Sequence, residues 1–479
     1  MKNIVGSDRI DASNEKVVEV MNPATGEFID TVPNLTEEDV DQAVSTAKKA
    51  QKKWAKMPLH ERGRILEKFV ELVEKNSEEL ATILCKETGK PITEARAEIG
   101  NTRTFVYGYV EKAKHLYGIT IPAGTEAGQE KTMQMTIRQP LGVVACIIPF
   151  NFPCDLFGQK VPSALIMGNS VIVKPSSYNP LTLHRYCELL LEAGVPAGVI
   201  NCISGDGRVV GHALAKHKDV HLVSVTGSTK VGMETMATAS QNLSHVMLEL
   251  GGNDAFIVDK DGDLDLAVEE LVWGRLYNTG QVCCASKRFL IQNEVKESFT
   301  KKVIERLNTI KVGMPEEEDT QIGCLITEEA AIEVENQVRK TLEQGARLAY
   351  GGRRNRAFFE PTILTEVTRD MDVMKDMEIF GPVIPICGFD TIEEAIEIAN
   401  QSTYGLCGNI ITSNMKTAFK VATELEVGGA IINGASFYRS AEMPFGGWKH
   451  SGIGNEGIAT TLEEMSKIKT IVLKNILED

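Results

Sequence analysis

The sequence predicts an α/β protein in which two domains are each built on a mainly parallel sheet. The chain has 479 residues, 43% of them hydrophobic, and at roughly 150 residues per domain this length corresponds to about three folding units. Short apolar runs alternate with helical stretches in two separate parts of the chain, which is typical of βαβ units. Two further strand-like segments lie outside both series.

The N-terminal region predicts a strand pair followed by amphipathic helices. Turn-forming residues at 22–26 separate the two strands, and Thr36 opens a sequence that resembles a capping box. The expected elements are strands at Val17–Met21 and Phe28–Val32, a helix from Thr36 to Pro58, and helices within Glu61–Lys90 and Thr93–Leu116.

The two βαβ series and the isolated segments complete the predicted architecture. The first series has strands at Val143–Ile148, Ser170–Val173, Val199–Ile203 and Leu222–Val225. The second has strands at Ala255–Val258, Arg288–Ile291, Ile410–Thr412 and Gly429–Asn433. The isolated segments, Lys131–Gln139 and Lys467–Leu473, alternate with period two. A two-stranded arm with one apolar face is not stable alone, so we expect it to pack on another subunit.

Composition narrows the possible partners and compartments. Lys and Arg number 51 against 66 Asp and Glu, a net charge of −15, which argues against nucleic-acid binding because phosphate contacts need clustered cations. The longest apolar run, Leu141 to Pro153, is shorter than the ~18 residues of a membrane span. Residues 1–13 show no signal-peptide pattern, and the ten cysteines lie mostly in apolar runs. We therefore expect a cytoplasmic protein that binds neither nucleic acid nor membranes.

Three polar residues at the ends of predicted strands or in loops are candidates for chemistry. Cys283, followed by Cys284, comes after Gly280-Gln281 and before a strand, where a positive local field would favour a nucleophilic thiolate. Both cysteines are alternatively ordinary buried thiols. Glu249, between two leucines, is either an edge carboxylate or a general base in an apolar site. Asn151, after Pro149-Phe150, is either a turn residue or a donor to an oxyanion.

Two glycine-containing turns indicate a phosphate-binding edge. The segment 205–211 follows a strand and nearly matches the dinucleotide fingerprint, but it has three residues, not two, before its last glycine. The segment 226–229 places backbone N–H groups at a helix start, where a pyrophosphate can bind. His217 and His221 lie four residues apart without an acidic partner between them, so the sequence predicts no metal site.

Seven short segments, taken in their order along the chain, make the sequence resemble the aldehyde dehydrogenase superfamily over essentially its whole length. The resemblance rests on the following segments: 149–153 (PFNFP), 174–177 (KPSS), 226–229 (TGST), 248–252 (LELGG), 280–283 (GQVC), 378–382 (EIFGP) and 444–449 (PFGGWK). It implies a Rossmann-type dinucleotide-binding domain over 1–118 and 141–251, a catalytic domain over 252–455, and an oligomerisation arm over 119–140 and 456–479. Members typically form dimers or tetramers, so we expect a homodimer or homotetramer.

The resemblance also implies a mechanism. Cys283 would attack the aldehyde carbon, and the Asn151 side chain and the Cys283 backbone N–H would stabilise the oxyanion. Hydride transfer to nicotinamide leaves a thioester, which water activated by Glu249 would hydrolyse to the carboxylate. Lys160 matches a lysine that supports proton relay from the base, and Cys284 would be a bystander beside the substrate.

Further residues match the family's cofactor-binding positions. Among them, Lys174 would bind the adenosine ribose, Ser228 would contact the pyrophosphate, and Glu378 and Phe380 would hold the nicotinamide end. The implied set is Ile148, Pro149, Phe150, Lys174, Ser176, Ser177, Gly207, Gly211, Thr226, Gly227, Ser228, Leu250, Glu378 and Phe380.

Departures from the family pattern bear on cofactor and substrate. Ser177 stands where a glutamate often favours NAD, so we expect NADP to be accepted along with NAD. Lys230 likewise replaces a frequent glutamate. Gln159 stands where enzymes for succinate semialdehyde and lactaldehyde often carry an arginine, which removes one carboxylate clamp. Arg439 lies in the segment that lines the substrate funnel and either binds a small polar or anionic aldehyde or is a solvated loop residue.

Other functions are less compatible with the motifs. A cofactor-free thiol hydrolase or esterase would use Cys283, Asn151 and Glu249 but would not need the segment 378–380 or the glycine-rich turns. A non-catalytic relative would be free to lose Cys283 or Glu249. A CoA-acylating relative usually lacks the base at the position of Glu249.

Overall fold

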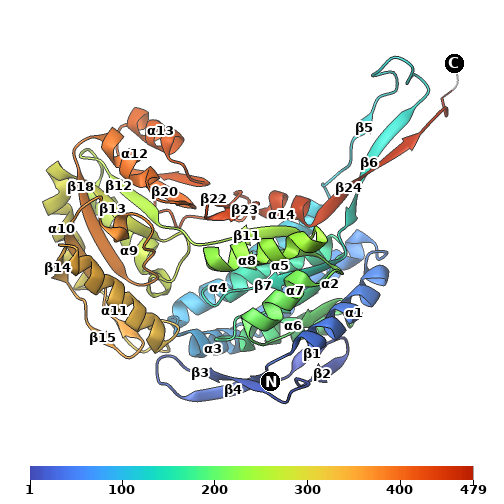
Figure 1. The fold of residues 1–479 in the computed structure, drawn as a ribbon, viewed down its shortest axis with the longest axis horizontal. Helices are drawn as coiled ribbons and strands as arrows, with labels where there is room; N and C mark the ends of the chain where they lie inside the picture. The colour runs from blue at the N-terminus through green and yellow to red at the C-terminus, as the bar shows by residue number, and fades with distance from the viewer. Residues whose placement is uncertain (478–479) are drawn as a thin grey trace.

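The computed structural model describes residues 1–477 and consists of two α/β lobes and a projecting β-sheet arm (Figure 1). The last two residues of the predicted arm, 478 and 479, lie outside the described residues. Within residues 1–477, no helix combines the length and apolar character that crossing a bilayer requires.

The first lobe contains an eight-stranded sheet in the order β2-β1-β9-β8-β7-β10-β11-β23. Its strands are β1 (Asn3–Val5), β2 (Asp8–Ile10), β7 (Val143–Ile147), β8 (Ser170–Lys174), β9 (Ile200–Cys202), β10 (Val220–Thr226), β11 (His245–Glu249) and β23 (Gly452–Ile453). The five central strands, from β9 to β11, are parallel, and the edge strands are antiparallel. This confirms the first predicted βαβ series.

The order of these strands creates a topological switch point. From β7 the chain adds β8 and β9 on one side and then β10 and β11 on the other, so consecutive crossovers diverge between β7 and β10. Ligands bind at such points, beyond the carboxyl ends of the strands. Alternate residues of β7 enter different cores: Val144 and Cys146 pack in one, and Val143 and Ala145 in the other.

Helices cover both faces of this sheet. They are α1 (Glu37–Trp54), α2 (Leu59–Lys75), α3 (Ser77–Thr88), α4 (Ile92–Ala113), α5 (Pro153–Ile166), α6 (Leu181–Ala193), α7 (His212–Lys216) and α8 (Thr229–Ala239). The predicted capping box of α1 is present between Thr36 and Asp39. The region 61–90 forms two helices because the chain turns at Asn76. The glycine segment begins as a π-helical turn, Gly207–Gly211, that leads into α7.

The second lobe contains a seven-stranded sheet in the order β14-β17-β18-β13-β12-β20-β21, parallel except for β14. Its strands are β12 (Asp254–Val258), β13 (Ser286–Gln292), β14 (Arg347–Tyr350), β17 (Thr362–Val367), β18 (Val383–Phe389), β20 (Cys407–Ile411) and β21 (Gly429–Ile432). Its helices are α9 (Leu264–Leu276), α10 (Asn293–Leu307), α11 (Glu328–Glu343), α12 (Ile392–Asn400) and α13 (Met415–Glu424). The second predicted series is therefore also present.

The arm is an antiparallel sheet of β24, β6 and β5 that extends away from both lobes (Figure 1). Its strands are β5 (Thr120–Ile121), β6 (Met133–Pro140) and β24 (Ser466–Leu473). The two isolated segments of the sequence pair along their length, from Ser466 opposite Pro140 to Leu473 opposite Met133. The segment before β24 returns to the first lobe: β23 pairs with β11, and α14 (Ile458–Glu464) packs in the core beside α4 and α5.

Short elements complete the described chain. They are the hairpin β3 (Val17–Met21) and β4 (Phe28–Pro33), the pair β15 (Arg354–Asn355) and β16 (Phe358–Phe359), the pair β19 (Tyr404–Gly405) and β22 (Trp448–Lys449), and 3-10 turns at Ser240–Asn242, Tyr277–Gly280 and Asp372–Met374.

Candidate active site

The predicted site residues lie at the carboxyl edge of the first sheet and on the facing loops of the second lobe. Asn151 follows β7, and Glu249 ends β11. Cys283 lies in the second lobe, between a 3-10 turn and β13. Asn151 and Cys283 line one cavity of about 470 Å³, which also includes Gln159, Cys284 and Arg439.

The backbone that precedes Cys283 is strained. Asn278 and Thr279 have φ values of 50° and 57°, a left-handed conformation that costs non-glycine residues of order 1–3 kcal/mol each. Gly280 follows with φ 78°, and a Cβ there would lie 2.5 Å from the backbone of Gly381. The turn therefore requires glycine at position 280, and such strain is concentrated at functional sites.

The two adjacent cysteines have different protonation behaviour. A hydrogen bond from Cys284 lowers the pKa of Cys283 to about 7; burial opposes this effect, and Lys287 and Arg439 support it. The same hydrogen bond, followed by burial, raises the pKa of Cys284 well above its usual value. Cys283 is therefore the thiolate former of the pair, because only the deprotonated sulfur is strongly nucleophilic.

Asn151 is fixed on both its side chain and its backbone. Its Nδ2 donates to the Gln281 carbonyl at 3.1 Å, which leaves a second N–H for another acceptor. Its backbone carbonyl accepts from Lys90 Nζ and from Asn278 Nδ2, each at 2.9 Å. The amide is buried and lines the same cavity as the Cys283 sulfur, as an oxyanion donor must.

Glu249 is a buried carboxyl group whose Oε2 has no hydrogen-bond partner among residues 1–477. Burial and then the Glu456 carboxylate raise the pKa of Glu249 well above its usual value, while Arg439 and Lys160 act in the opposite direction. A carboxylate whose oxygen is unpartnered and whose pKa is raised is a stronger base than an exposed one, as a general base requires.

Lys160 belongs to a buried charged group that the sequence analysis identified only in part. Its Nζ donates to Glu456 Oε1 at 2.6 Å and to Ser224 Oγ at 3.0 Å. Arg439 donates to the other oxygen of Glu456 at 3.0 Å and stacks on Phe445, with its Cζ 4.0 Å from the ring centroid. The interpretation of Arg439 as a solvated loop residue therefore does not hold.

The residues of the first lobe that are predicted to bind the adenosine end of the cofactor gather at the ends of β8 and β9. Lys174 Nζ donates to the Pro175 carbonyl at 3.0 Å, and a Cβ on Gly207 would lie 4.0 Å from it. Burial lowers the pKa of Lys174 to about 8. Ser177 Oγ donates to the Gly205 carbonyl at 2.9 Å. Residues separated by about thirty positions therefore meet at one edge.

The switch point is completed by the start of α8. Ser228 caps this helix by accepting from Val231 N–H, and Gly227 N–H donates to the Glu249 carbonyl at 3.0 Å. The Thr226 hydroxyl oxygen is buried without a hydrogen-bond partner among the described residues. A helix N-terminus with a nearby unpartnered hydroxyl fits an anionic pyrophosphate.

The second lobe contributes Glu378 and Phe380 to the cleft. Glu378 Oε1 accepts from Lys287 Nζ at 2.8 Å and from Gly252 N–H at 3.3 Å. The Phe380 ring meets Phe150 edge-to-face, with centroids 6.0 Å apart. The remaining predicted residues lie along the same edge: Ile148 and Pro149 after β7, Ser176 after β8, Gly211 in the π-helical turn, and Leu250 after β11.

The sequence profile of the aldehyde dehydrogenase family matches residues 10–471. The chain belongs to the aldehyde dehydrogenase family. A 3-sulfolactaldehyde dehydrogenase of Priestia aryabhattai is 39% identical over 456 residues, 95% of this chain and 94% of the relative. A lactaldehyde dehydrogenase of Methanococcus aeolicus is 37% identical over 464 residues, 96% of this chain and 98% of the relative.

Solved structures confirm the fold. An aldehyde dehydrogenase of Brucella melitensis superposes with a TM-score of 0.95 at 38% identity and covers 99% of this chain and 97% of that one. The crystal structure of an NADP-dependent enzyme of E. coli superposes with a TM-score of 0.96 at 34% identity and covers 99% of this chain and 98% of that one. The expected fold class is therefore correct, and the chain is an aldehyde oxidoreductase.

Sequence reasoning missed several residues of this aldehyde dehydrogenase site. Glu456 was assigned to the arm, although the surrounding glycines at 454 and 457 indicate a loop. Lys287, four residues after Cys283, donates to the Cys283 carbonyl and to Glu378. Lys90 lies in the loop before α4, where no periodicity signals burial. Glu98 falls on the apolar stripe of α4 between Ala95 and Thr102, and this position is the signal that could have found it.

Proposed function

We propose that this chain oxidises a small aldehyde to its carboxylate with NAD or NADP, through a covalent intermediate on Cys283. The observation that carries the proposal is that Cys283, with its lowered pKa, shares one cavity with the amide of Asn151. The bound nicotinamide would supply the hydride acceptor, and the residues at the ends of β8 and β10 would hold its dinucleotide.

The chain's own groups perform the remaining steps. The Cys283 thiolate forms the S–C bond, and the carbonyl electrons move to oxygen, where the second N–H of Asn151 and the Cys283 backbone N–H stabilise the charge. Loss of hydride from this carbon gives the thioester. Glu249 then takes a proton from water, the hydroxide attacks the thioester carbon, and sulfur leaves as thiolate. The proton then leaves Glu249 for water, and the Lys160 ammonium, which donates to Glu456, favours the Glu249 carboxylate that remains.

The cavity supports a small polar or anionic aldehyde as the substrate. Asp155 Oδ1, Gln159 Oε1 and Arg439 Nε are buried in its lining without hydrogen-bond partners among the described residues. Two acceptors and one cationic donor match a hydroxyl or an acidic group next to the aldehyde carbon. The relatives named for sulfolactaldehyde and lactaldehyde act on compounds of this kind.

We also propose that NADP is accepted at least comparably with NAD. Ser177 places no carboxylate near the adenosine ribose, and the Lys174 ammonium is at the same edge. Support comes from the E. coli structure, which is described as an NADP-dependent enzyme.

Location, assembly and domain boundaries complete the proposal. The ten cysteines are all free, which suits the reducing cytoplasm. Exposed apolar residues of β24, Ile468 and Val472, support pairing of arms in a homodimer or homotetramer. The dinucleotide-binding and catalytic domains would correspond to the first and second lobes.

The decisive assay mixes the protein with NAD or NADP and a panel of short hydroxylated, carboxylated and sulfonated aldehydes, without CoA. We expect one molecule of cofactor to be reduced, as followed by its absorbance, for each aldehyde molecule oxidised, and a carboxylate as the product. Ester hydrolysis without any cofactor reduction across the panel would instead indicate the thiol hydrolase.

A further inference from the structure

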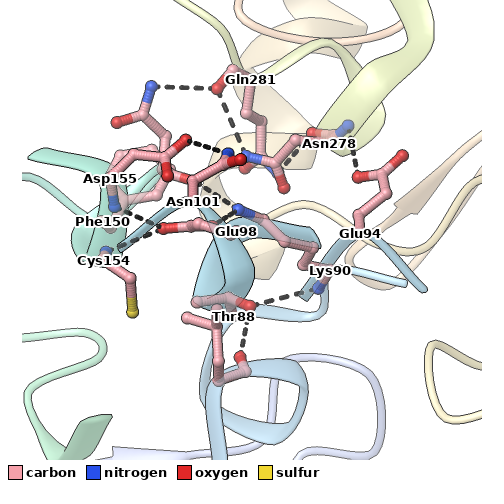
Figure 2. A network of polar contacts seen from close by, with 12 residues as sticks. Thr88, Lys90, Glu94, Glu98, Asn101, Phe150, Cys154, Asp155, Asn278 and Gln281 are labelled. Carbon is pink, nitrogen blue, oxygen red and sulfur yellow. Dashed lines mark hydrogen bonds and ion pairs between the residues drawn. The ribbon is translucent and has the colours of Figure 1, made fainter. Parts of the chain in front are cut away.

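A polar network, buried at Lys90, Glu98 and Asn278 and half-buried at Glu94, joins the two lobes beside Asn151 (Figure 2). It consists of Lys90, Glu94 and Glu98, which lie on or just before α4 in the first lobe, and of Asn278 in the second lobe. None of these residues lies at a position that the family resemblance singles out.

The network fixes the backbone of Asn151 from both lobes. Lys90 Nζ, from the first lobe, and Asn278 Nδ2, from the second, donate to the same Asn151 carbonyl oxygen. The Lys90 ammonium also forms an ion pair with Glu98 and lies 4.1 Å from the centroid of the Phe152 ring. The position of Asn151 therefore depends on contacts with both lobes.

Glu98 fixes the start of the helix that follows Asn151. Its Oε1 accepts from Cys154 N–H at 2.8 Å and from Asp155 N–H at 3.4 Å, in the first turn of α5. A carboxylate at this position satisfies free N–H groups and interacts favourably with the helix dipole. The chain on both sides of Phe152 is thereby held.

Glu94 fixes the strained turn that leads to Cys283. Its Oε2 accepts from Asn278 N–H at 2.8 Å, across the boundary between the lobes. Gln281 then connects this turn to Asn151, because its N–H donates to the Asn278 carbonyl at 3.0 Å and its own carbonyl accepts from Asn151 Nδ2 at 3.1 Å. Figure 2 shows Glu94 pointing toward Asn278 from the α4 side.

These contacts matter because the two oxyanion donors come from different lobes. The Asn151 side chain belongs to the first lobe, and the Cys283 backbone N–H belongs to the second. Their separation is therefore set by how the lobes are held together at this point, and a displacement of about 1 Å is enough to lower catalysis strongly.

We propose that Glu94 is a positioning residue that sets the geometry of the oxyanion hole by holding the Asn278 turn against the first lobe, together with the Lys90–Glu98 pair. The proposal rests on the proposed thiol mechanism and adds to it which residues align the two oxyanion donors. Glu94 contacts no reacting atom and acts through Asn278.

The test compares three substitutions of Glu94. Glu94→Ala removes the acceptor, Glu94→Asp withdraws it by one methylene, and Glu94→Gln keeps an oxygen at the same reach. Burial raises the pKa of Glu94 to about 8, so its carboxyl is largely protonated at neutral pH and Gln is a close replacement. Arg103 lies on α4 like Glu94 and forms an exposed ion pair with Glu74 of α2, so Arg103→Ala is the matched control.

Three rates are measured for each variant: aldehyde oxidation, acylation by p-nitrophenyl acetate, and alkylation of Cys283 by iodoacetamide. The first two pass through an oxyanion, whereas alkylation does not. We expect Ala and Asp to lower kcat and the acylation rate together by about tenfold, with KM and alkylation within twofold of wild type. Glu94→Gln and Arg103→Ala should keep all three rates within twofold of wild type.

Two results would overturn the inference. Acylation at the wild-type rate in both Glu94→Ala and Glu94→Asp would show that the contact between Glu94 and Asn278 does not determine the geometry of the oxyanion hole. Parallel loss of acylation and alkylation would show that Glu94 only maintains the loop. If Glu94→Ala does not fold, the comparison of Glu94→Asp with Glu94→Gln tests the inference by the same criteria. A wild type that acylates but does not oxidise aldehydes would instead contradict the proposed function.

Discussion

Four buried lysines surround the active-site cleft, and their partners differ. Lys287 pairs with Glu378, which is partly exposed. Lys160 pairs with Glu456, and Lys90 pairs with Glu98; each of the four side chains is no more than 1% exposed. Lys174 is 4% exposed, but within residues 1–477 its ammonium group has no carboxylate within hydrogen-bonding distance.

The difference between the two fully buried pairs lies in what else they contact. Burial disfavours the charge of Glu456, yet Lys160 and Arg439 outweigh it and lower its pKa, and these charges in turn act on Glu249. The Lys90–Glu98 pair is instead bonded to backbone groups of residues 151, 154 and 155. One pair is therefore placed to control the protonation of Glu249, and the other to hold geometry. Buried ion pairs add little net stability, which favours such specific roles.

The largest expected effect on activity comes from removing the proposed nucleophile, Cys283. Cys283→Ala should abolish aldehyde oxidation and ester acylation at every pH. Cys284→Ala should stay active, with its pH profile shifted to higher pH, because it loses the hydrogen bond that lowers the pKa of Cys283. Steady-state cofactor reduction and p-nitrophenyl acetate turnover measure both. An inactive Cys284→Ala beside an active Cys283→Ala would reverse the assignment.

The next effect tests the geometric side of the comparison. Asn151→Ala removes the side-chain donor that Lys90 and Asn278 position, and loss of one oxyanion donor lowers kcat by about 10²–10³. Iodoacetamide alkylation of Cys283 should continue at nearly the wild-type rate. A kcat within threefold of wild type would exclude Asn151 from stabilising the oxyanion.

The third effect tests the proton side. Glu249→Gln should leave acylation and hydride transfer working, because the pKa of Cys283 is about 7 without help from the base, but it should block thioester hydrolysis. Rapid mixing should show one burst of reduced cofactor per active site and then slow turnover. Full steady-state activity would remove Glu249 from the mechanism.

Residues next to predicted strands were within reach of sequence reasoning, and residues that depend on tertiary packing were not. Asn151 and Glu249 follow apolar runs whose parallel pairing brings them to one edge. Glu456 contacts Lys160 across 296 positions, from a glycine-bounded loop without periodicity. Lys90 lies in the loop before α4, and Glu98 lies on the buried stripe of that helix with Ala95 and Thr102. Only the folded chain shows that the two side chains pair behind residues 151–155.

The smallest effect concerns Lys174, the lysine without a carboxylate. The Ser177 hydroxyl donates to the Gly205 carbonyl, so acceptance of a 2′-phosphate rests on the absence of a carboxylate at position 177 and on the Lys174 ammonium. Ser177→Glu would place a carboxylate beside this edge. At about 4 Å and an effective dielectric near 20, its repulsion of a 2′-phosphate is roughly 4 kcal/mol, while ribose hydroxyls would gain an acceptor.

We therefore expect Ser177→Glu to shift preference from NADP toward NAD by tenfold or more, about 1.4 kcal/mol per decade. The measurement is kcat/KM for both cofactors in the wild type and the variant. Ser240→Glu is the control, since it adds the same charge at the far end of α8, away from the strand ends. Strict NAD use by the wild type, or an unchanged ratio in Ser177→Glu, would show that Lys174 binds the ribose whatever stands at position 177.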